Sequence, residues 1–209
     1  MIKIKIITVV IMIIFPGLTF SQIGFGTTGG IDFYQRYTNP DDGIAYPSAG
    51  NVLLNFVFGP KIWVGNKNVS LSVEMPFNLG MTTLAIKDFK GMGSFAVPVI
   101  GKLNFSALSG FYPAFGKGMS VGAGIQWTRT ELLLLRRYKE KNVKRKFFKT
   151  YVLEIDFGYG SFGTAGYVYV RAGKSFRSGA KILNIGVLVS INSTYTKKNV
   201  EYIINRKSR

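Results

Sequence analysis

Residues 69–79, VSLSVEMPFNL, alternate without interruption between apolar and polar or small side chains. One face carries the apolar residues Val69, Leu71, Val73, Met75, Phe77 and Leu79, and the other carries Ser70, Ser72, Glu74, Pro76 and Asn78. A period of two is the pattern of a β-strand. The stretch of eleven residues also matches the roughly 9 to 11 that a tilted strand needs to cross a bilayer. We therefore predict a membrane-spanning strand.

The first 22 residues have the three parts of a secretory signal peptide. Lys3 and Lys5 precede an apolar run over residues 6–15, a Pro16-Gly17 break follows, and small residues stand before Gln22. We therefore predict a cleaved signal peptide over residues 1–21, a barrel over 22–195 and a basic C-terminal tail over 196–209. An uncleaved anchor helix is the alternative, and the shortness of the apolar run disfavours it.

The rest of the sequence predicts that any membrane crossing is made by strands. There is no cysteine, so neither disulfides nor a lipid-anchor cysteine are expected. After Gln22 no apolar run reaches the roughly 18 to 20 residues of a membrane helix. Strands can cross lipid only as a closed barrel, because an open edge would leave backbone groups unpaired.

The alternation test gives eight candidate strands, an even number as bacterial single-chain barrels require. They lie over residues 23–37, 51–65, 69–79, 93–105, 119–131 and 150–160, with a seventh around 167–172 and an eighth around 183–192. Tyr34 is expected to face inward, and Val52 outward with Leu54 and Phe56. The fold class predicted is all-β, an antiparallel up-and-down transmembrane β-barrel.

The predicted connections alternate between the two ends of the barrel. With both termini in the periplasm, the outer connections are residues 38–50, 80–92 and 132–149 and a short turn at Arg177. The inner connection over residues 106–118 is longer than a periplasmic turn usually is. Trp127 and Tyr151 are expected near the outer rim, and Phe105, Tyr159 and Tyr195 near the inner rim, as aromatic girdles.

This layout resembles the small eight-stranded outer-membrane barrels of the OmpA/OmpX type across residues 22–195. FAVPVIGKLNF over residues 95–105 looks like a strand of the outer-membrane β-barrel domain proteins of Bacteroidota. The resemblance implies a fold and a location in the cell outer membrane, and no reaction. The chain departs from the family pattern because Tyr195 is followed by fourteen further residues, in which Val200, Tyr202 and Ile204 alternate as in a further short strand.

The absence of histidine and cysteine from the chain argues against an enzyme. Nucleophile and base pairs built on either residue are excluded, as are the histidine and thiolate ligands of zinc. No catalytic residue, metal ligand or cofactor is therefore expected.

Charged residues on the predicted inward faces are expected to fill the barrel interior as a paired network. They are Asp32, Lys61, Glu74, Lys102, Arg129, Glu154, Asp156 and Arg171. An eight-stranded barrel is just wide enough for side chains to fill, and buried charges must be paired. We expect Glu74 to pair with Lys102, and Glu154 or Asp156 to pair with Arg129 or Arg171. The alternative is acid–base chemistry by Glu154 and Asp156.

A strongly basic segment stands in the predicted outer connection over residues 132–149. Its cations are Arg136, Arg137, Lys139, Lys141, Lys144, Arg145, Lys146 and Lys149. Such a loop is expected to bind anions, with lipopolysaccharide phosphates as the candidate partner, and a solvated hairpin tip is the alternative. The net charge of +17 is concentrated in this loop and the tail, so nucleic acid is not expected as a partner.

The function predicted from the sequence is that of a non-enzymatic, monomeric outer-membrane barrel for envelope integrity or surface interaction. One alternative is a narrow porin or channel for small or hydrophobic solutes. Another is a subunit of a secretion or assembly complex, for which LLLL over residues 132–135 could be a docking edge. A soluble ligand-binding barrel is disfavoured because its outward residues would have to be polar.

Overall fold

The computed structural model of the chain describes residues 22–40, 48–83, 91–141 and 145–196. The predicted signal peptide over residues 1–21 lies outside the described residues. So do almost all of the predicted basic tail and the further short strand predicted after Tyr195.

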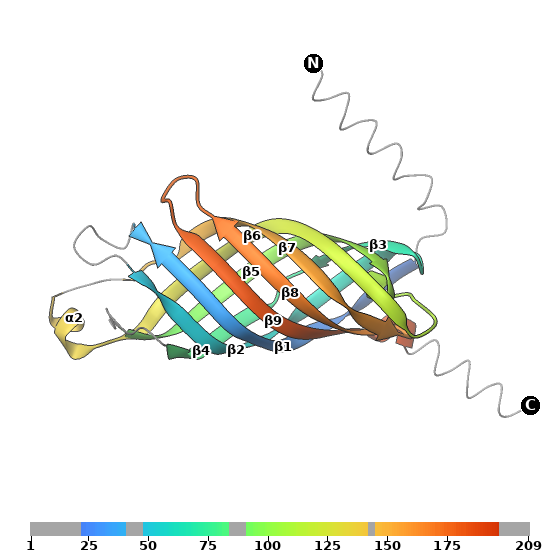
Figure 1. Cartoon of the computed structure of the whole chain (residues 1–209), viewed down its shortest axis with the longest axis horizontal. Coiled ribbons are helices and arrows are strands. Elements are labelled where there is room, and N and C mark those ends of the chain that lie inside the picture. Colours follow the sequence, from blue (N-terminus) through green and yellow to red (C-terminus); the bar gives the residue numbers. More distant parts are fainter. Residues whose placement is uncertain (1–21, 41–47, 84–90, 142–144, 197–209) are drawn as a thin grey trace, which may run out of the picture.

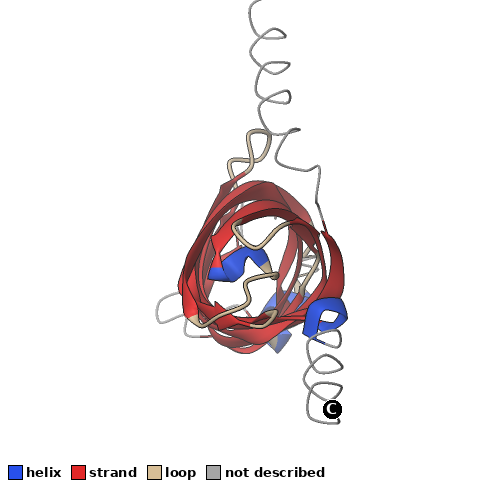
Figure 2. Ribbon diagram, turned by 90° about the vertical axis from the view of Figure 1, so that its right-hand side faces the viewer, coloured by secondary structure: helices blue, strands red, loops and turns tan. Residues whose placement is uncertain are grey.

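The described residues form one antiparallel sheet that closes on itself (Figures 1 and 2). Its strands are β1 (Gln22–Asn39), β2 (Ser48–Gly65), β3 (Val69–Glu74), β4 (Phe77–Thr83), β5 (Gly91–Ser106), β6 (Gly116–Leu134), β7 (Phe148–Ser161), β8 (Thr164–Lys174) and β9 (Lys181–Asn192). Apart from β3 and β4, each strand pairs with its neighbours in the chain, and β1 pairs with both β2 and β9. Because β3 and β4 follow one another along a single line between β2 and β5, the ring has eight strands. The predicted up-and-down eight-stranded barrel is confirmed.

The stretch over residues 69–79 keeps its alternation but is not one uninterrupted strand. Pro76 has no backbone N–H to give to the ladder, and β3 ends at Glu74 while β4 begins at Phe77. At the break, the Met75 N–H donates to the Pro60 carbonyl at 3.1 Å. Leu71, Val73, Met75 and Phe77 all point outward, and Ser72 and Glu74 are buried.

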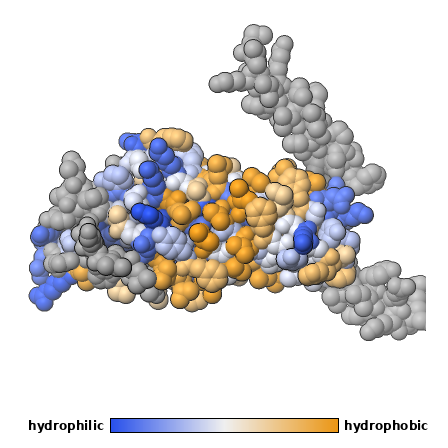
Figure 3. Space-filling model, in the orientation of Figure 1, coloured by the Kyte–Doolittle hydropathy of each residue, from blue (hydrophilic) through white to orange (hydrophobic). Residues whose placement is uncertain are grey.

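The barrel is apolar outside and largely polar inside. Phe56, Phe58 and Leu153 are 64%, 65% and 67% exposed, whereas Asp32 and Glu74 are completely buried. Figure 3 shows the apolar band across the middle of the wall, with hydrophilic residues toward both ends. A continuous apolar belt of this kind would be unfavourable in water and matches the hydrocarbon of a bilayer.

The helices of the described residues are short, and none of them has the length and hydropathy that a membrane-crossing helix needs.

Irregular residues shift the alternation in several strands and overturn two predicted orientations. Leu54 has a φ of 56° and Glu131 a φ of 54°, and the pairing of β1 with β9 shifts between Asp32 and Tyr34. A one-residue bulge moves every side chain beyond it to the other face. Val52, predicted outward, is therefore fully buried, and Tyr34, predicted inward, is only partly buried, with Gln35 and Tyr37 taking the interior positions.

The strands extend further toward the outer end than the sequence predicted. β4 ends at Thr83 and β5 begins at Gly91, so the predicted loop over residues 80–92 is shorter. β6 runs to Leu134, where Leu133 and Leu134 pair with Met92 and Gly91 of β5. These leucines are therefore paired on the side of β5, whereas the pairing of β6 with β7 ends at Thr128 and Phe148, so the docking edge considered for LLLL stays a prediction.

The long inner connection folds back against the end of the barrel, and we call residues 106–115 the end segment. It contains the short helix η3 (Ala107–Ser109), and Leu108 and Phe111 are buried. The Ser70 hydroxyl donates to the Ser109 carbonyl at 2.7 Å, and the Asn192 amide donates to the Gly110 carbonyl at 2.9 Å. Figure 2 shows loop and helical segments across the barrel opening. The end segment is long because it covers this opening.

The apolar band gives a prediction that compares one substitution at two depths. Val73 lies midway along residues 69–79, so Val73→Arg should destabilise the folded protein by about 2 to 4 kcal/mol. Val69→Arg, at the strand end, should cost only about 0 to 1 kcal/mol because an arginine there can reach the interface. Urea unfolding from liposomes measures both, and equal costs would contradict the transmembrane orientation.

Candidate functional site

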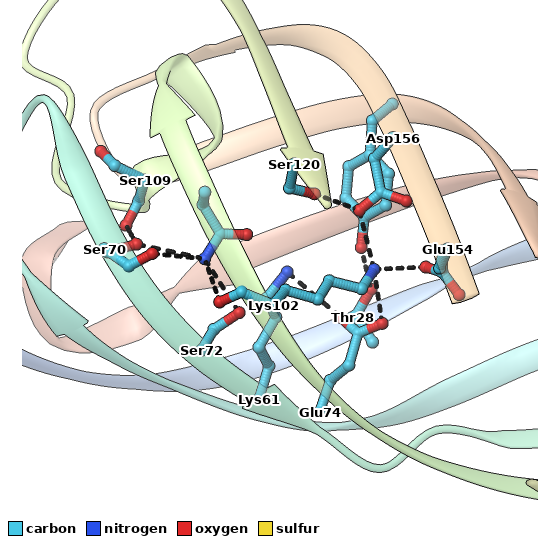
Figure 4. A network of polar contacts seen from close by, with 12 residues as sticks. Thr28, Lys61, Ser70, Ser72, Glu74, Lys102, Ser109, Ser120, Glu154 and Asp156 are labelled. Carbon is cyan, nitrogen blue, oxygen red and sulfur yellow. Dashed lines mark hydrogen bonds and ion pairs between the residues drawn. The ribbon is translucent and has the colours of Figure 1, made fainter. Parts of the chain in front are cut away.

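The most strongly charged part of the interior surrounds Lys102 of β5 (Figure 4). The Lys102 ammonium lies 2.6 Å from Glu74 Oε1 and 2.8 Å from Asp156 Oδ2, and it also pairs with Glu154. Gly122 stands opposite Lys102 on β6, and a Cβ there would lie 2.7 Å from Lys102 Cγ. The glycine therefore leaves the space through which the lysine reaches three carboxylates.

Two more cations extend this cluster to the neighbouring strands. Lys61 Nζ of β2 lies 3.1 Å from Glu74 Oε2, and Arg171 of β8 pairs through Nε with Glu154. Both lysine ammonium groups also lie over the ring of Tyr167, at 5.3 and 5.2 Å from its centroid. We call Lys61, Glu74, Lys102, Glu154, Asp156 and Arg171 the charge cluster.

Asp32 is stabilised differently, by hydrogen bonds from amide donors. Its Oδ2 accepts hydrogen bonds from the side chains of Asn184, Asn78 and Asn55, at 2.8, 3.1 and 3.4 Å. Hydrogen bonds to a charged acceptor are stronger than those between neutral groups. Asp32 therefore lies beside the charge cluster in an amide pocket formed by β2, β4 and β9.

The two carboxylates considered for acid–base chemistry are held in ion pairs. Glu154 and Asp156 are both buried and both bind the ammonium of Lys102. Within residues 22–40, 48–83, 91–141 and 145–196, no group of three or more histidine, cysteine, aspartate or glutamate side chains is arranged to hold a metal ion.

The structure brings seven of the eight predicted interior charges inside the barrel. The predicted ion pairs of Glu74 with Lys102 and of Glu154 with Arg171 are present. Arg129 is the exception, since its neighbours Thr128 and Thr130 are buried and it faces outward. Its assignment to the interior was wrong because Arg129 lies two residues after Trp127 and therefore shares the outward face of that residue. Asp156, which was expected to pair with Arg129 or Arg171, pairs with Lys102 instead.

A second buried ion pair, near the outer end, was not predicted. The Arg145 guanidinium donates through Nε and Nη2 to Glu131 Oε2 at 2.8 and 2.5 Å, and the Tyr37 hydroxyl donates to Glu131 Oε1 at 3.4 Å. Arg145 therefore belongs to the interior and not to the anion-binding loop predicted from the sequence. No periodicity relates Arg145 to Glu131, because Arg145 lies outside any strand and the backbone of Glu131 is irregular.

The remaining part of the basic loop forms the short helix α2 (Arg136–Glu140) and its flanks. Arg136 is 93% exposed and pairs with Glu140 at 3.0 Å. Lys139, Lys141, Lys146 and Lys149 are also exposed. Lys144 and the side chain of Arg137 lie outside what the structure describes.

Comparisons with known proteins give similarity in structure only. No protein-family model and no curated protein sequence matches the chain. Among solved structures, Neisserial surface protein A is similar with a TM-score of 0.48 and 7% identity, covering 82% of this chain and 98% of that one. Ail of Yersinia pestis has a TM-score of 0.45 and 9% identity over 82% and 96% of the two chains. The N-terminal barrel domain of OprF from Pseudomonas aeruginosa has a TM-score of 0.43 and 12% identity over 82% and 97%. The fold assignment above rests on the strand pairing of this chain and not on these similarities.

The charge cluster gives a prediction for a double-mutant cycle. Lys102→Met leaves three buried carboxylates without their shared cation and should cost about 3 to 5 kcal/mol of folding free energy. The double variant Lys102→Met with Glu74→Gln should lose less folding free energy than the sum of the losses of the two single variants, because it contains one unpaired carboxylate fewer than Lys102→Met alone. Urea unfolding measures the cycle, with the exposed Lys139→Met in place of Lys102→Met as an additive control. Additivity in both cycles would show that Lys102 and Glu74 do not interact.

Proposed function

We propose that the chain is a non-enzymatic outer-membrane barrel with a closed interior, which acts in envelope integrity or surface interaction. The observation that carries this proposal is the charge cluster. Its members come from β2, β3, β5, β7 and β8, so side chains from opposite parts of the wall meet in the interior. A lumen crossed in this way has no continuous path for a solute.

The end segment supports the same proposal, because it closes the interior at a second position along the barrel. Leu108 belongs to a buried apolar group with Val57, Tyr167 and Leu188. Gly110 has a φ of 79° and lies so close to Trp63 that a Cβ would be 2.9 Å from its ring. The segment is thus packed into the end of the barrel beyond the charge cluster, and a solute would have to displace both.

The lengths of two connections support the orientation that we propose for the barrel in the membrane. β1 begins and β9 ends at the same end of the barrel as the short connections over residues 66–68 and 162–163. Outer-membrane barrels have short periplasmic turns and longer external loops. We therefore assign α2 to the cell surface, where its exposed cations are available to an anionic partner such as lipopolysaccharide phosphate. Nucleic acid is not part of this proposal.

The closed interior is tested by conductance in planar bilayers. The purified wild-type barrel should carry no steady ion current, because the charge cluster fills its cross-section. Lys61→Ala with Glu74→Ala in the charge cluster, combined with Leu108→Ala and Phe111→Ala in the end segment, should allow intermittent current. Lys139→Ala on α2 should leave the barrel silent. Steady current through the wild-type protein would overturn the proposal in favour of a narrow channel.

A further inference from the structure

The outer wall of the barrel has a groove near its external end. The groove crosses β6, β7, β8, β9 and the end of β1, and its volume is about 1080 Å³. Ala123, Ala172 and Gly173 form a floor of small residues, and Leu153 and Phe176 stand beside them. Phe176 and Tyr151 are in contact, with ring centroids 5.5 Å apart. The groove is therefore apolar and faces the surroundings of the barrel, not its interior.

Three cations lie at the external side of this groove. Arg36 of β1, Lys174 of β8 and Lys181 of β9 line it and are exposed. Lys174 and Lys181 are direct partners in the pairing of β8 with β9, and Lys181 is paired with Thr38, two residues from Arg36. Like charges placed opposite one another on the same face of a sheet are destabilising unless an anion lies between them.

The described part of the chain supplies no such anion at the groove. Five of its carboxylates, those of Asp32, Glu74, Glu131, Glu154 and Asp156, are buried in the interior. The sixth, Glu140, pairs with Arg136 on α2. The three cations of the groove thus lie beside apolar surface without a carboxylate from the described residues.

We propose that this groove is a binding site for a phosphorylated glycolipid of the outer leaflet. The cations bind phosphate, and the apolar groove takes the acyl chains. Charge complementarity and the external position of the cations point to this ligand, and the position rests on the sidedness proposed above. Arginine and lysine both bind phosphate well, and basic pockets beside a membrane wall bind lipid headgroups.

The spread of the cations favours a glycolipid with two phosphates over a glycerophospholipid with one. Arg36 and Lys174 are separated by two strand spacings, roughly 10 Å. The groove itself crosses five adjacent strands. A headgroup made of a phosphorylated disaccharide, carrying several acyl chains, matches both dimensions. This site is separate from the α2 cations.

The test is lipid binding by the folded, detergent-solubilised barrel, measured by native mass spectrometry with purified lipid A carrying two phosphates. Arg36→Gln, Lys174→Gln and Lys181→Gln together should weaken binding about tenfold or more, because charge-assisted bonds to phosphate are lost. The matched control removes exposed charges at the opposite end of the barrel, by Lys67→Gln and Lys117→Gln, and should bind as the wild type does. Ala172→Phe, which fills the groove without changing charge, should also weaken binding.

Heat-modifiability on a gel establishes that each variant is a folded barrel before its binding is compared. Lipid A that binds the groove variant and the wild type equally would overturn the inference, as would an equal loss of binding in the variant with Lys67 and Lys117 replaced. Phosphatidylglycerol bound as tightly as lipid A would overturn the assignment to a glycolipid, and dephosphorylated lipid A should bind weakly. A negative result in the lipid-binding test would not overturn the proposal of a closed interior, because conductance tests that proposal separately.

Discussion

The buried ammonium of Lys102 sets the strongest requirement on the rest of the structure. An ion removed from water costs several kcal/mol unless it is paired in good geometry. Here the compensation comes from Glu74 on β3 and from Glu154 and Asp156 on β7, while Lys102 is on β5. All of these side chains meet only in one register of the barrel. A slip by one residue would turn a charged side chain toward lipid, so the pairing opposes alternative registers whatever its net contribution to stability.

The same alternation explains why binding is proposed at the rim of the barrel and closure at its centre. Inward positions carry the charges that fill the lumen, so the matching outward positions are apolar and leave the middle of the wall without charge. The outward cations of the described strands, such as Arg36, Arg129 and Lys174, lie toward the strand ends, where arginine and lysine can reach headgroups. The wall thus has its cations near the end where we propose the lipid site, while the charge cluster occupies the interior.

Period-two patterning predicted the fold, the eight strands and most of the interior charges, because each depends on which face a residue takes. It failed where that period is broken locally. The left-handed backbone at Leu54 reverses Val52, and the shift after Asp32 reverses Tyr34. Features that depend on the closed barrel had no sequence signal, including the pair of Arg145 with Glu131, the packing of the end segment and the groove. Arg36 is far in sequence from Lys174 and Lys181, and only the pairing of β1 with β9 brings it beside them.

The central claim, a closed interior organised by Lys102, is tested most directly by amine-reactive labelling of the folded barrel, quantified lysine by lysine by mass spectrometry. Lys102 and Lys61 are buried, whereas Lys139 and Lys174 are exposed. The account predicts that Lys139 and Lys174 are modified in the folded protein, and that Lys102 and Lys61 are modified only after unfolding. Labelling of Lys102 in the folded barrel at the rate of Lys139 would contradict it.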